Sequence, residues 1–413
     1  MTRDGGNIQV TLVGGGMIAQ DQILPSLYHL QRLGVVGAIS VVARRSATLR
    51  ELAENKSILD AFPGQSFRAY PDLSEDPQKA FPDLAANSIG KMPPRHLVIV
   101  AVPDQFHFSV IKQALEADQN VLAVKPLVLK YKEAVAIEKL ARSRGLFVGV
   151  EYHKRFDRRS LEARGKYREG KFGEFKLGEA KLIEPYYYRH SNFQNWFTRE
   201  NTDPFTYVGC HYVDLVYFIT GLRPVEVSVQ AVEGKFPNGN LGYLWSNGRV
   251  TWENGAILSV LNGLGYPNEG AGSNDQAMCL FCEGADRGGL IHHCDQFRGV
   301  AHSYADGSHP HPFRFINPDY FRLVPWQGNG LKPTGYGYDS IEANVMAAVR
   351  IRAERSAAKR RSLLEKIDRK GIIATPANSS INELVVEAGR LSLRHAGRRV
   401  AIHYGTHPTV RLK

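Results

Sequence analysis

A lysine and a histidine occupy positions from which they could handle the charge and the proton of a reacting oxygen. Lys125 directly follows the apolar run 121–124, and His211 lies within Tyr207-Val208-Gly209-Cys210-His211-Tyr212-Val213-Asp214. An imidazole has an unperturbed pKa of roughly 6.5 and can accept and return a proton at neutral pH. An ammonium group can stabilise negative charge that develops on an oxygen. Lys125 and His211 are therefore candidate catalytic residues.

Tyr207 is the third catalytic candidate. If residues 207–214 form a helix, Tyr207, His211 and Asp214 share one face, because they are spaced by four and three residues. A tyrosine hydroxyl can donate a hydrogen bond or relay a proton, but it adds no negative charge at neutral pH. Plainer alternatives stay open: an interior histidine, a surface lysine and a tyrosine that fills the core.

A glycine-rich segment follows the first predicted strand, Ile8–Val13. Gly14-Gly15-Gly16-Met17-Ile18-Ala19 gives the pattern Gly-x-Gly-x-x-Ala between this strand and a helix-like stretch. Small residues permit a tight turn and a close approach to a pyrophosphate, and the helix N-terminus presents free amide groups to the anion. The segment predicts a dinucleotide site that includes Gly14, Gly16, Met17 and Ile18; the alternative is a tight turn without a ligand.

The end of the second predicted strand bears on the choice between NAD and NADP. An acidic residue usually accepts hydrogen bonds from the ribose of NAD at this place. Here the sequence reads Ala43-Arg44-Arg45-Ser46. Two guanidinium groups and a hydroxyl suit a 2′-phosphate through charge-assisted hydrogen bonds. Arg44, Arg45 and Ser46 therefore favour NADP over NAD, unless both arginines are simply solvated.

The elements that must position these residues alternate between strand and helix in the first 150 residues. Strands are predicted at Ile8–Val13, Ile39–Ala43, Leu97–Val102, Asn120–Val124 and Leu146–Val150, and helices at 20–33, 47–54, 108–117 and 131–144. This rhythm is typical of a doubly wound parallel sheet, in which ligands bind off the carboxyl ends of the strands. Val102, Pro103 and His107 follow one such end and join Lys125 as predicted cofactor contacts.

The pattern changes after residue 150, where strand-like pieces follow one another at Val225–Val232, Arg249–Trp252 and Ala256–Leu261. We predict an α/β protein with a Rossmann domain at 1–150 and, at 151–413, an α+β domain with a mostly antiparallel open sheet. Residues 262–340 lack periodicity and predict a loop region on the substrate side. Helical patterns return at Ser340–Lys370 and Ser380–His395.

The order of these motifs resembles the Gfo/Idh/MocA oxidoreductases, typified by glucose-fructose oxidoreductase and inositol dehydrogenase, over residues 8 to about 225. Lys125 and Pro126 match the end of a family Glu-Lys-Pro stretch, with Val124 in place of the glutamate. The resemblance implies hydride transfer between a nicotinamide and a carbon of a sugar, cyclitol or related polyol, without an added metal.

A second family motif, Asp-x-Gly-x-His-x-x-Asp, is matched by Gly209, His211 and Asp214, with Tyr207 at the first acidic position. The resemblance implies that His211 removes the hydroxyl proton while Lys125 binds the reacting oxygen. We expect Tyr207 to face the substrate and Asp214 to be a structural partner. The predicted substrate contacts are Lys125, His153, Arg155, Asn195, Trp196, Tyr207 and His211.

Composition limits the other classes of function. The formal net charge is +11, but acidic residues are interspersed among the basic ones near the C-terminus and no nucleic-acid motif is present, so we expect no nucleic-acid partner. The sequence shows no membrane-spanning stretch and no secretion signal, and with four cysteines it predicts a cytoplasmic protein with reduced thiols.

Cys279, Cys282, His292, His293 and Cys294 are ligand types that zinc favours. In a strand, however, Cys279 and Cys282 would point to opposite faces, so no metal site is predicted.

The open sheet of the second domain needs covering, which predicts a homodimer or homotetramer. Two alternative functions remain: a glycosidase that works by transient oxidation, and a non-catalytic regulator that senses NAD(P).

Overall fold

The computed structural model describes residues 7–270, 274–294 and 320–413, which fold into two compact units. Unit 1 comprises residues up to 128, 132–153 and 320–378, and unit 2 comprises 129–131, 154–319 and 379–413. The sequence placed all of 151–413 in the second domain, whereas 320–378 lies with unit 1. The reason is packing: α9 (Tyr336–Ala353) buries Ile341, Val345, Ala348 and Ile351 in the core of unit 1.

The described part of unit 1 contains a parallel sheet of six strands in the order β3-β2-β1-β4-β5-β6. The strands are β1 (Ile8–Val13), β2 (Val36–Val42), β3 (Arg68–Tyr70), β4 (Leu97–Val100), β5 (Asn120–Val124) and β6 (Val148–Glu151). This order is that of a doubly wound dinucleotide fold. β4 is fully buried, as expected for a strand covered on both faces.

Helices and short turns connect these strands. The helical elements are η1 (Ala19–Ile23), α1 (Leu24–Arg32), α2 (Ser46–Ala53), α3 (Lys56–Ala61), α4 (Leu84–Gly90), η2 (Asp104–Phe106), α5 (His107–Glu116), α6 (Tyr131–Arg144) and η3 (His153–Phe156). After residue 319 unit 1 continues with the hairpin β13 (Arg322–Pro325) and β14 (Leu331–Thr334), then α9, α10 (Ala357–Lys370) and α11 (Pro376–Ser379). Arg32 of α1 holds the hairpin, since its guanidinium stacks on Trp326 and donates to the carbonyls of Asn329 and Leu331.

Unit 2 is built on a mixed sheet whose described strands run in the order β12-β11-β7-β10-β9-β8-β15-β16. The strands are β7 (Glu174–Pro185), β8 (Pro224–Lys235), β9 (Leu241–Trp252), β10 (Ile257–Tyr266), β11 (Asp275–Glu283), β12 (Gly288–Cys294), β15 (Val400–His403) and β16 (Thr409–Leu412). β10 and β7 pair in parallel, and the other described pairs are antiparallel. The predicted fold class is thus confirmed.

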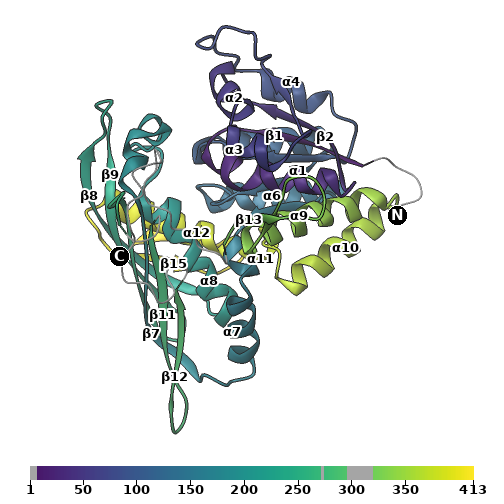
Figure 1. Cartoon of the computed structure of the whole chain (residues 1–413). Coiled ribbons are helices and arrows are strands. Elements are labelled where there is room, and N and C mark those ends of the chain that lie inside the picture. The colour runs from purple at the N-terminus through teal and green to yellow at the C-terminus, as the bar shows by residue number, and fades with distance from the viewer. Residues whose placement is uncertain (1–6, 271–273, 295–319) are drawn as a thin grey trace. The chain divides into compact units, whose positions relative to one another are not determined.

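Helices cover one face of this sheet. α7 (Arg158–Arg168), α8 (Cys210–Thr220) and α12 (Ile381–Arg394) lie on the same side in Figure 1. The short elements η4 (Tyr186–His190), η5 (Asn192–Asn195) and η6 (Phe205–Gly209) precede α8. Leu177, Val232, Leu261 and Phe281 are exposed on strands of the sheet, and Val232 reaches 62% exposure. Such alternation of buried and exposed residues is typical of a sheet packed on one side.

The predicted loop at 262–340 is wrong in part, because β11 and β12 form a regular antiparallel hairpin there. Buried residues alternate with exposed or partly exposed ones along both strands, but the exposed set includes apolar Phe281 and Leu290, so the sequence shows no clear alternation of apolar and polar residues. Residues 271–273 and 295–319 of the predicted loop lie outside the described part of the chain.

Candidate active site

The glycine-rich turn leads from β1 into a helix that begins with a wide turn. Gly14 has φ of +110°, and a Cβ there would stand 2.0 Å from the carbonyl oxygen of Ala101. Gly16 is exposed, and a Cβ on it would meet nothing within 4 Å. The fold therefore requires glycine at position 14, whereas glycine at position 16 leaves open space beside a helix start. Met17 and Ile18, both partly buried, complete this turn before η1.

We predict opposite outcomes for alanine at these two glycines. Gly14→Ala combines a left-handed φ with a backbone clash, so it should lower the free energy of unfolding by about 1–3 kcal/mol. Gly16→Ala should leave the unfolding temperature unchanged but weaken NAD(P)H binding, because its methyl group occupies the space that a pyrophosphate needs. Thermal unfolding and NAD(P)H fluorescence titration measure the two effects; equal unfolding temperatures for both variants would contradict this division.

Of the three predicted NADP contacts that follow β2, two have exposed side chains and the third is buried. Arg44 and Arg45 are exposed between β2 and α2. Ser46 is buried, and its hydroxyl donates to the carbonyl of Glu75 over 2.8 Å. The prediction that Ser46 binds the cofactor is therefore corrected: its hydroxyl anchors the first turn of α2 to a neighbouring loop.

His107 also differs from its predicted role. The ring is fully buried, with Nδ1 2.8 Å from the carbonyl oxygen of Pro126 and Nε2 2.8 Å from that of Val102. It links the segments that follow β4 and β5 instead of contacting a cofactor. Lys125, whose bond to Pro126 is cis, and Pro103 remain partly exposed at these strand ends.

The end of β6 carries a buried polar network that the sequence did not reveal. Glu151 accepts hydrogen bonds from Nδ1 of His153 over 2.8 Å and from Nε2 of Gln22 over 2.9 Å. Tyr320 donates its hydroxyl to Oε1 of Gln22 over 2.6 Å. These partners lie 129 and 298 positions apart in the chain, so no local pattern connects them. The one sequence feature that could have indicated this network is Glu151 itself, a charged residue at the end of a buried strand and two residues before His153, a predicted substrate contact.

Glu151 is held in its ionised form. Burial alone would raise its pKa, but the charge and hydrogen bond of His153, helped by Gln22, outweigh burial and lower the pKa below its usual value. His153 also contacts the rings of Tyr320 and Tyr336, with centroids 5.0 and 5.6 Å away. The ring is therefore fixed by stacking as well as by its carboxylate partner.

In unit 2, Tyr207 lies in an aromatic cluster. Its ring contacts Phe193, Trp196 and Phe197, with centroids 5.2, 5.4 and 5.9 Å away. Tyr207 belongs to the π-helical turn η6, a rare geometry that is frequent at functional sites. The structure thus brings together Tyr207 and Trp196 among the predicted substrate residues.

Two other predicted residues of unit 2 lie nearby in the chain. Asn195 is exposed, and its side-chain amide donates to Oδ1 of Asn192. In turn, Oδ1 of Asn195 accepts a hydrogen bond from the side-chain amide of Asn238 in the β8–β9 turn. His211 lies in the first turn of α8 and is 5% exposed. The helix predicted from Tyr207 to Asp214 is present, with a π-helical start.

Arg155 does not have the predicted role of a substrate contact. Its guanidinium is 1% exposed and makes two bonds to Asp214, from Nε to Oδ2 over 2.8 Å and from Nη2 to Oδ1 over 2.5 Å. Asn382 of α12 donates to the same carboxylate over 2.7 Å. A buried, bidentate pair of this kind fixes α8 to its neighbours. Asp214 is therefore a structural partner, as expected.

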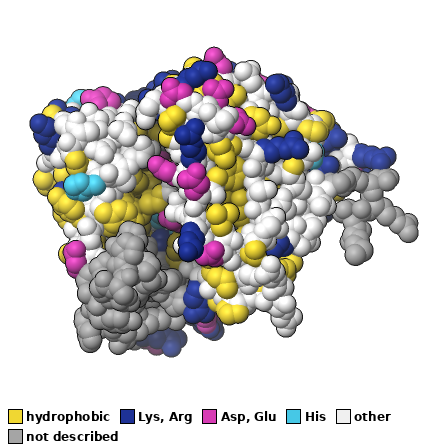
Figure 2. Space-filling view, turned by 45° about the horizontal axis from the view of Figure 1, so that its top comes forward, with side chains coloured by type: hydrophobic (Ala, Val, Ile, Leu, Met, Phe, Trp, Pro, Cys, Tyr) yellow, Lys and Arg dark blue, Asp and Glu magenta, His cyan; other side chains and the backbone are white. Residues whose placement is uncertain are grey.

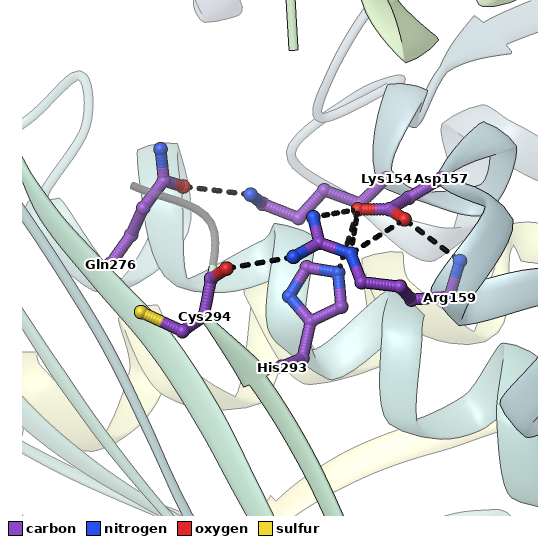
Figure 3. Close-up of polar contacts among 6 residues, drawn as sticks. All are labelled: Lys154, Asp157, Arg159, Gln276, His293 and Cys294. Atoms are coloured by element: carbon purple, nitrogen blue, oxygen red, sulfur yellow. Dashed lines mark hydrogen bonds and ion pairs between the residues drawn. The ribbon is translucent and has the colours of Figure 1, made fainter. Parts of the chain in front are cut away.

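Residues on either side of Arg155 form a separate polar cluster with residues of β11 and β12, shown in Figure 3. Asp157 accepts from Nε2 of His293 over 3.0 Å and from Arg159, and these bonds outweigh burial and hold the pKa of Asp157 well below its usual range. Buried Lys154 donates to Gln276 over 2.7 Å. The cluster joins the start of α7 to β11 and β12.

The zinc-type residues do not converge in this structure. Cys282 is buried on β11, whereas Cys279 lies on its other face, and His293 faces Asp157. In Figure 3, Cys294 accepts a bond through its backbone carbonyl and its sulfur points away from Asp157 and His293. Among residues 7–270, 274–294 and 320–413, no three His, Cys, Asp or Glu side chains are placed to hold a metal ion.

Comparison with known proteins supports the interpretation of unit 1. Residues 8–152 match the family described as "Oxidoreductase family, NAD-binding Rossmann fold". The uncharacterized oxidoreductase YfiI of Bacillus subtilis is 28% identical over 144 residues, which cover 34% of this chain and 33% of that protein. The uncharacterized oxidoreductase YhhX of Escherichia coli is 40% identical over 68 residues, covering 16% of this chain and 20% of that protein. The chain thus spans a third or less of the length of these curated relatives.

Solved structures share the fold over nearly the whole chain. GenD2 from gentamicin A biosynthesis, in complex with NAD, has a TM-score of 0.66 at 17% identity and covers 98% of both chains. An inositol dehydrogenase homolog from Azotobacter vinelandii, complexed with NADH and myo-inositol, has a TM-score of 0.61 at 18% identity and covers 96% of this chain and 98% of the other. Residues 8–152 are thus similar to the NAD-binding domain of the Gfo/Idh/MocA oxidoreductases, and the solved structures share the fold of the rest of the chain.

Proposed function

We propose that this protein is an NAD(P)-dependent oxidoreductase that transfers a hydride between the nicotinamide and a carbon of a sugar, cyclitol or related polyol or ketone. The glycine turn carries the proposal: Gly14 is required by the backbone, and Gly16 leaves open space at the start of a helix on the carboxyl side of a parallel sheet. The family match over residues 8–152 and the fold shared with inositol dehydrogenases support it.

The residues of this chain have distinct roles in the proposed reaction. The turn from Gly14 to Ile18 would hold the pyrophosphate, and the bound nicotinamide supplies the hydride acceptor. His211 accepts the hydroxyl proton as the carbon–oxygen bond becomes a carbonyl and the carbon gives up its hydride. Lys125 hydrogen-bonds that oxygen, and the Tyr207 hydroxyl contacts the substrate. Trp196 beside Tyr207 supports a sugar-binding role for the aromatic cluster.

We infer a preference for NADP from Arg44 and Arg45, which are exposed after β2 where an acid would otherwise bind ribose. Replacing both with alanine should raise the dissociation constant of NADPH by at least about tenfold, since each charge-assisted bond contributes roughly 1.5–3 kcal/mol when formed. The dissociation constant of NADH should change less than twofold. Parallel titrations of both cofactors measure this; an equal loss for NADH and NADPH would argue against a 2′-phosphate site.

The distribution of charge fits a small-molecule substrate better than nucleic acid. On the face shown in Figure 2, Lys and Arg side chains stand beside Asp and Glu instead of forming a continuous basic surface. Arg360 of the basic helix α10 is buried and donates to the carbonyls of Gly145 and Arg355.

In the described ranges, every helix is too short or too polar to span a lipid bilayer. A homodimer or homotetramer through the exposed apolar side chains of the unit 2 sheet, and a cytoplasmic location, remain part of the proposal.

In the first experiment, purified protein is incubated with each member of a panel of sugars and inositols in the presence of NAD or NADP, and the absorbance of the reduced nicotinamide is recorded. Turnover on at least one polyol is expected. Cofactor binding without turnover across the panel would overturn the proposal and favour a regulator, whereas glycoside cleavage without net cofactor reduction would favour the glycosidase alternative.

A further inference from the structure

A loop between β3 and α4, residues 72–81, is fastened to the corner where β2 leads into α2. At one end of the loop, the backbone nitrogen of Phe81 donates to the carbonyl of Arg44 over 2.9 Å. At the other end, the carbonyl of Glu75 accepts two hydrogen bonds of 2.8 Å, from the hydroxyl of Ser46 and from Nη2 of Arg50. The 72–81 loop therefore crosses this corner from α2 to the end of β2.

Lys79 lies between the two attached points of the loop, four residues after Glu75 and two before Phe81. Its Nζ is 3.3 Å from Oε2 of Glu75 and 4.7 Å from the centre of the Phe81 ring. The lysine side chain is 56% exposed and that of the glutamate 40%. An exposed ion pair of this kind adds little stability, so the ammonium can leave Glu75 at small cost when a stronger anion binds.

The other two carboxylates of the loop are engaged by their own turns. Oδ1 of Asp72 accepts from the backbone nitrogen of Ser74 over 2.9 Å and from its hydroxyl over 2.6 Å. Oδ1 of Asp76 accepts from the backbone nitrogen of Gln78 over 2.9 Å. Glu75 is therefore the acid of this loop that pairs with the ammonium.

We propose that Lys79 is a specificity-determining residue that contacts the 2′-phosphate of NADP beside Arg44 and Arg45, and that Glu75 holds its ammonium when no phosphate is bound. The end of the second strand is where a dinucleotide fold binds the ribose and its 2′-phosphate. The bond from Phe81 to the carbonyl of Arg44 brings the loop of the lysine to that place. This inference rests on the proposed function and deepens its preference for NADP.

The exchange of partners favours NADP through charge. A phosphate monoester carries about −1.5 to −2 charges at neutral pH and has three acceptor oxygens, whereas the carboxylate of Glu75 carries one charge. The ammonium of Lys79 therefore gains by moving from the carboxylate to the phosphate. NAD has no 2′-phosphate, so its binding leaves the pair of Lys79 and Glu75 unchanged.

The first test is Lys79→Met, which should raise the dissociation constant of NADPH at least about fivefold, because a hydrogen bond to a charged group contributes more than the exposed pair that it replaces. The dissociation constant of NADH should change less than twofold. Lys79→Arg keeps the charge and should bind NADPH within about threefold of the unsubstituted protein. Fluorescence titration of each purified variant with both cofactors, at one low salt concentration, measures these values.

The matched control is Lys112→Met on α5. Lys112 pairs with Glu116 over 3.7 Å and is 52% exposed, so the same kind of pair is removed at a helix away from the end of β2. The control should bind both cofactors like the unsubstituted protein. An unchanged dissociation constant of NADPH in Lys79→Met, or an equal loss for NADH, would overturn the role of Lys79.

Glu75→Gln should have the opposite effect. It removes the competitor of the phosphate, so the dissociation constant of NADPH should fall roughly two- to fourfold while that of NADH stays the same. Glu116→Gln is the matched control and should change neither value. Weaker NADPH binding in Glu75→Gln would overturn the exchange, because Glu75 would then be needed to place the lysine.

The outcomes separate this inference from the proposed function. If replacement of Arg44 and Arg45 weakens NADPH binding selectively but Lys79→Met does not, the proposed preference for NADP stands and the role of Lys79 fails. If no polyol turns over, the proposed reaction fails, whereas the titrations still decide whether Lys79 contacts the 2′-phosphate.

Discussion

Replacement of His211 by asparagine should lower kcat for polyol oxidation by about 10²- to 10⁴-fold, the contribution that a positioned general base makes. Lys125→Met should lower kcat by about 10²- to 10³-fold, because the ammonium stabilises charge that develops on the reacting oxygen. His211→Asn should bind NAD(P)H with nearly unchanged affinity, because His211 is predicted to contact the substrate and not the cofactor. The measurement is initial rate by absorbance of the reduced nicotinamide, beside a fluorescence titration of the cofactor.

Matched controls exist for both substitutions. His292→Asn changes an exposed histidine of β12, and Lys176→Met changes an exposed lysine of β7 whose side chain is 45% exposed. Neither should alter kcat by more than about twofold, since surface substitutions away from a site have small effects. Rates for His211→Asn that remain within threefold of the unsubstituted protein would show that another group accepts the proton.

Arg155→Met should destabilise unit 2 by about 3–5 kcal/mol, because it leaves the carboxylate of Asp214 buried without its bidentate partner. The matched control is Arg223→Met, which removes a pair with Glu253 of similar length but with the arginine 53% exposed. A surface pair of that kind contributes about 0–1 kcal/mol. Because the chain has two units, hydrogen exchange of the amides of α8 reports the local effect more directly than global unfolding.

The double variant Arg155→Met with Asp214→Leu distinguishes a buried charge from lost packing. Replacing both partners with apolar side chains removes the unpaired charge and should recover much of the protection lost in the single variant. Equal exchange rates of α8 in Arg155→Met and Arg223→Met would contradict the assignment of Arg155 as a structural residue.

Residues whose roles depend on neighbours in the chain were predictable, and residues whose roles depend on distant partners were not. The turn at Gly14 and Gly16 was identified because a strand, a glycine pattern and a helix follow in sequence. Arg155 was assigned to the substrate because an exposed and a buried arginine look alike until Asp214, 59 positions away, is placed against it.

The same reason explains the incorrect roles of Ser46 and His107. Each lies at the carboxyl end of a predicted strand, which is the expected place for a ligand contact. Each side chain instead forms hydrogen bonds with backbone carbonyl groups. The hydroxyl of Ser46 bonds to the carbonyl of Glu75, and the imidazole of His107 bonds to those of Pro126 and Val102. Whether a polar side chain at a strand end faces a ligand or a carbonyl depends on loop paths that periodicity does not encode.

The return of residues 320–378 to unit 1 affects how the protein can be made. The segment from Ile341 to Ile351, which completes the unit 1 core, is translated only after all strands of the unit 1 parallel sheet and the described elements of unit 2 from α7 to β12 have been synthesised. Domains generally fold as units during synthesis, the N-terminal one first. Here the core of the N-terminal unit contains Ile341, Val345 and Ile351, so it can be completed only after residue 351 has been synthesised.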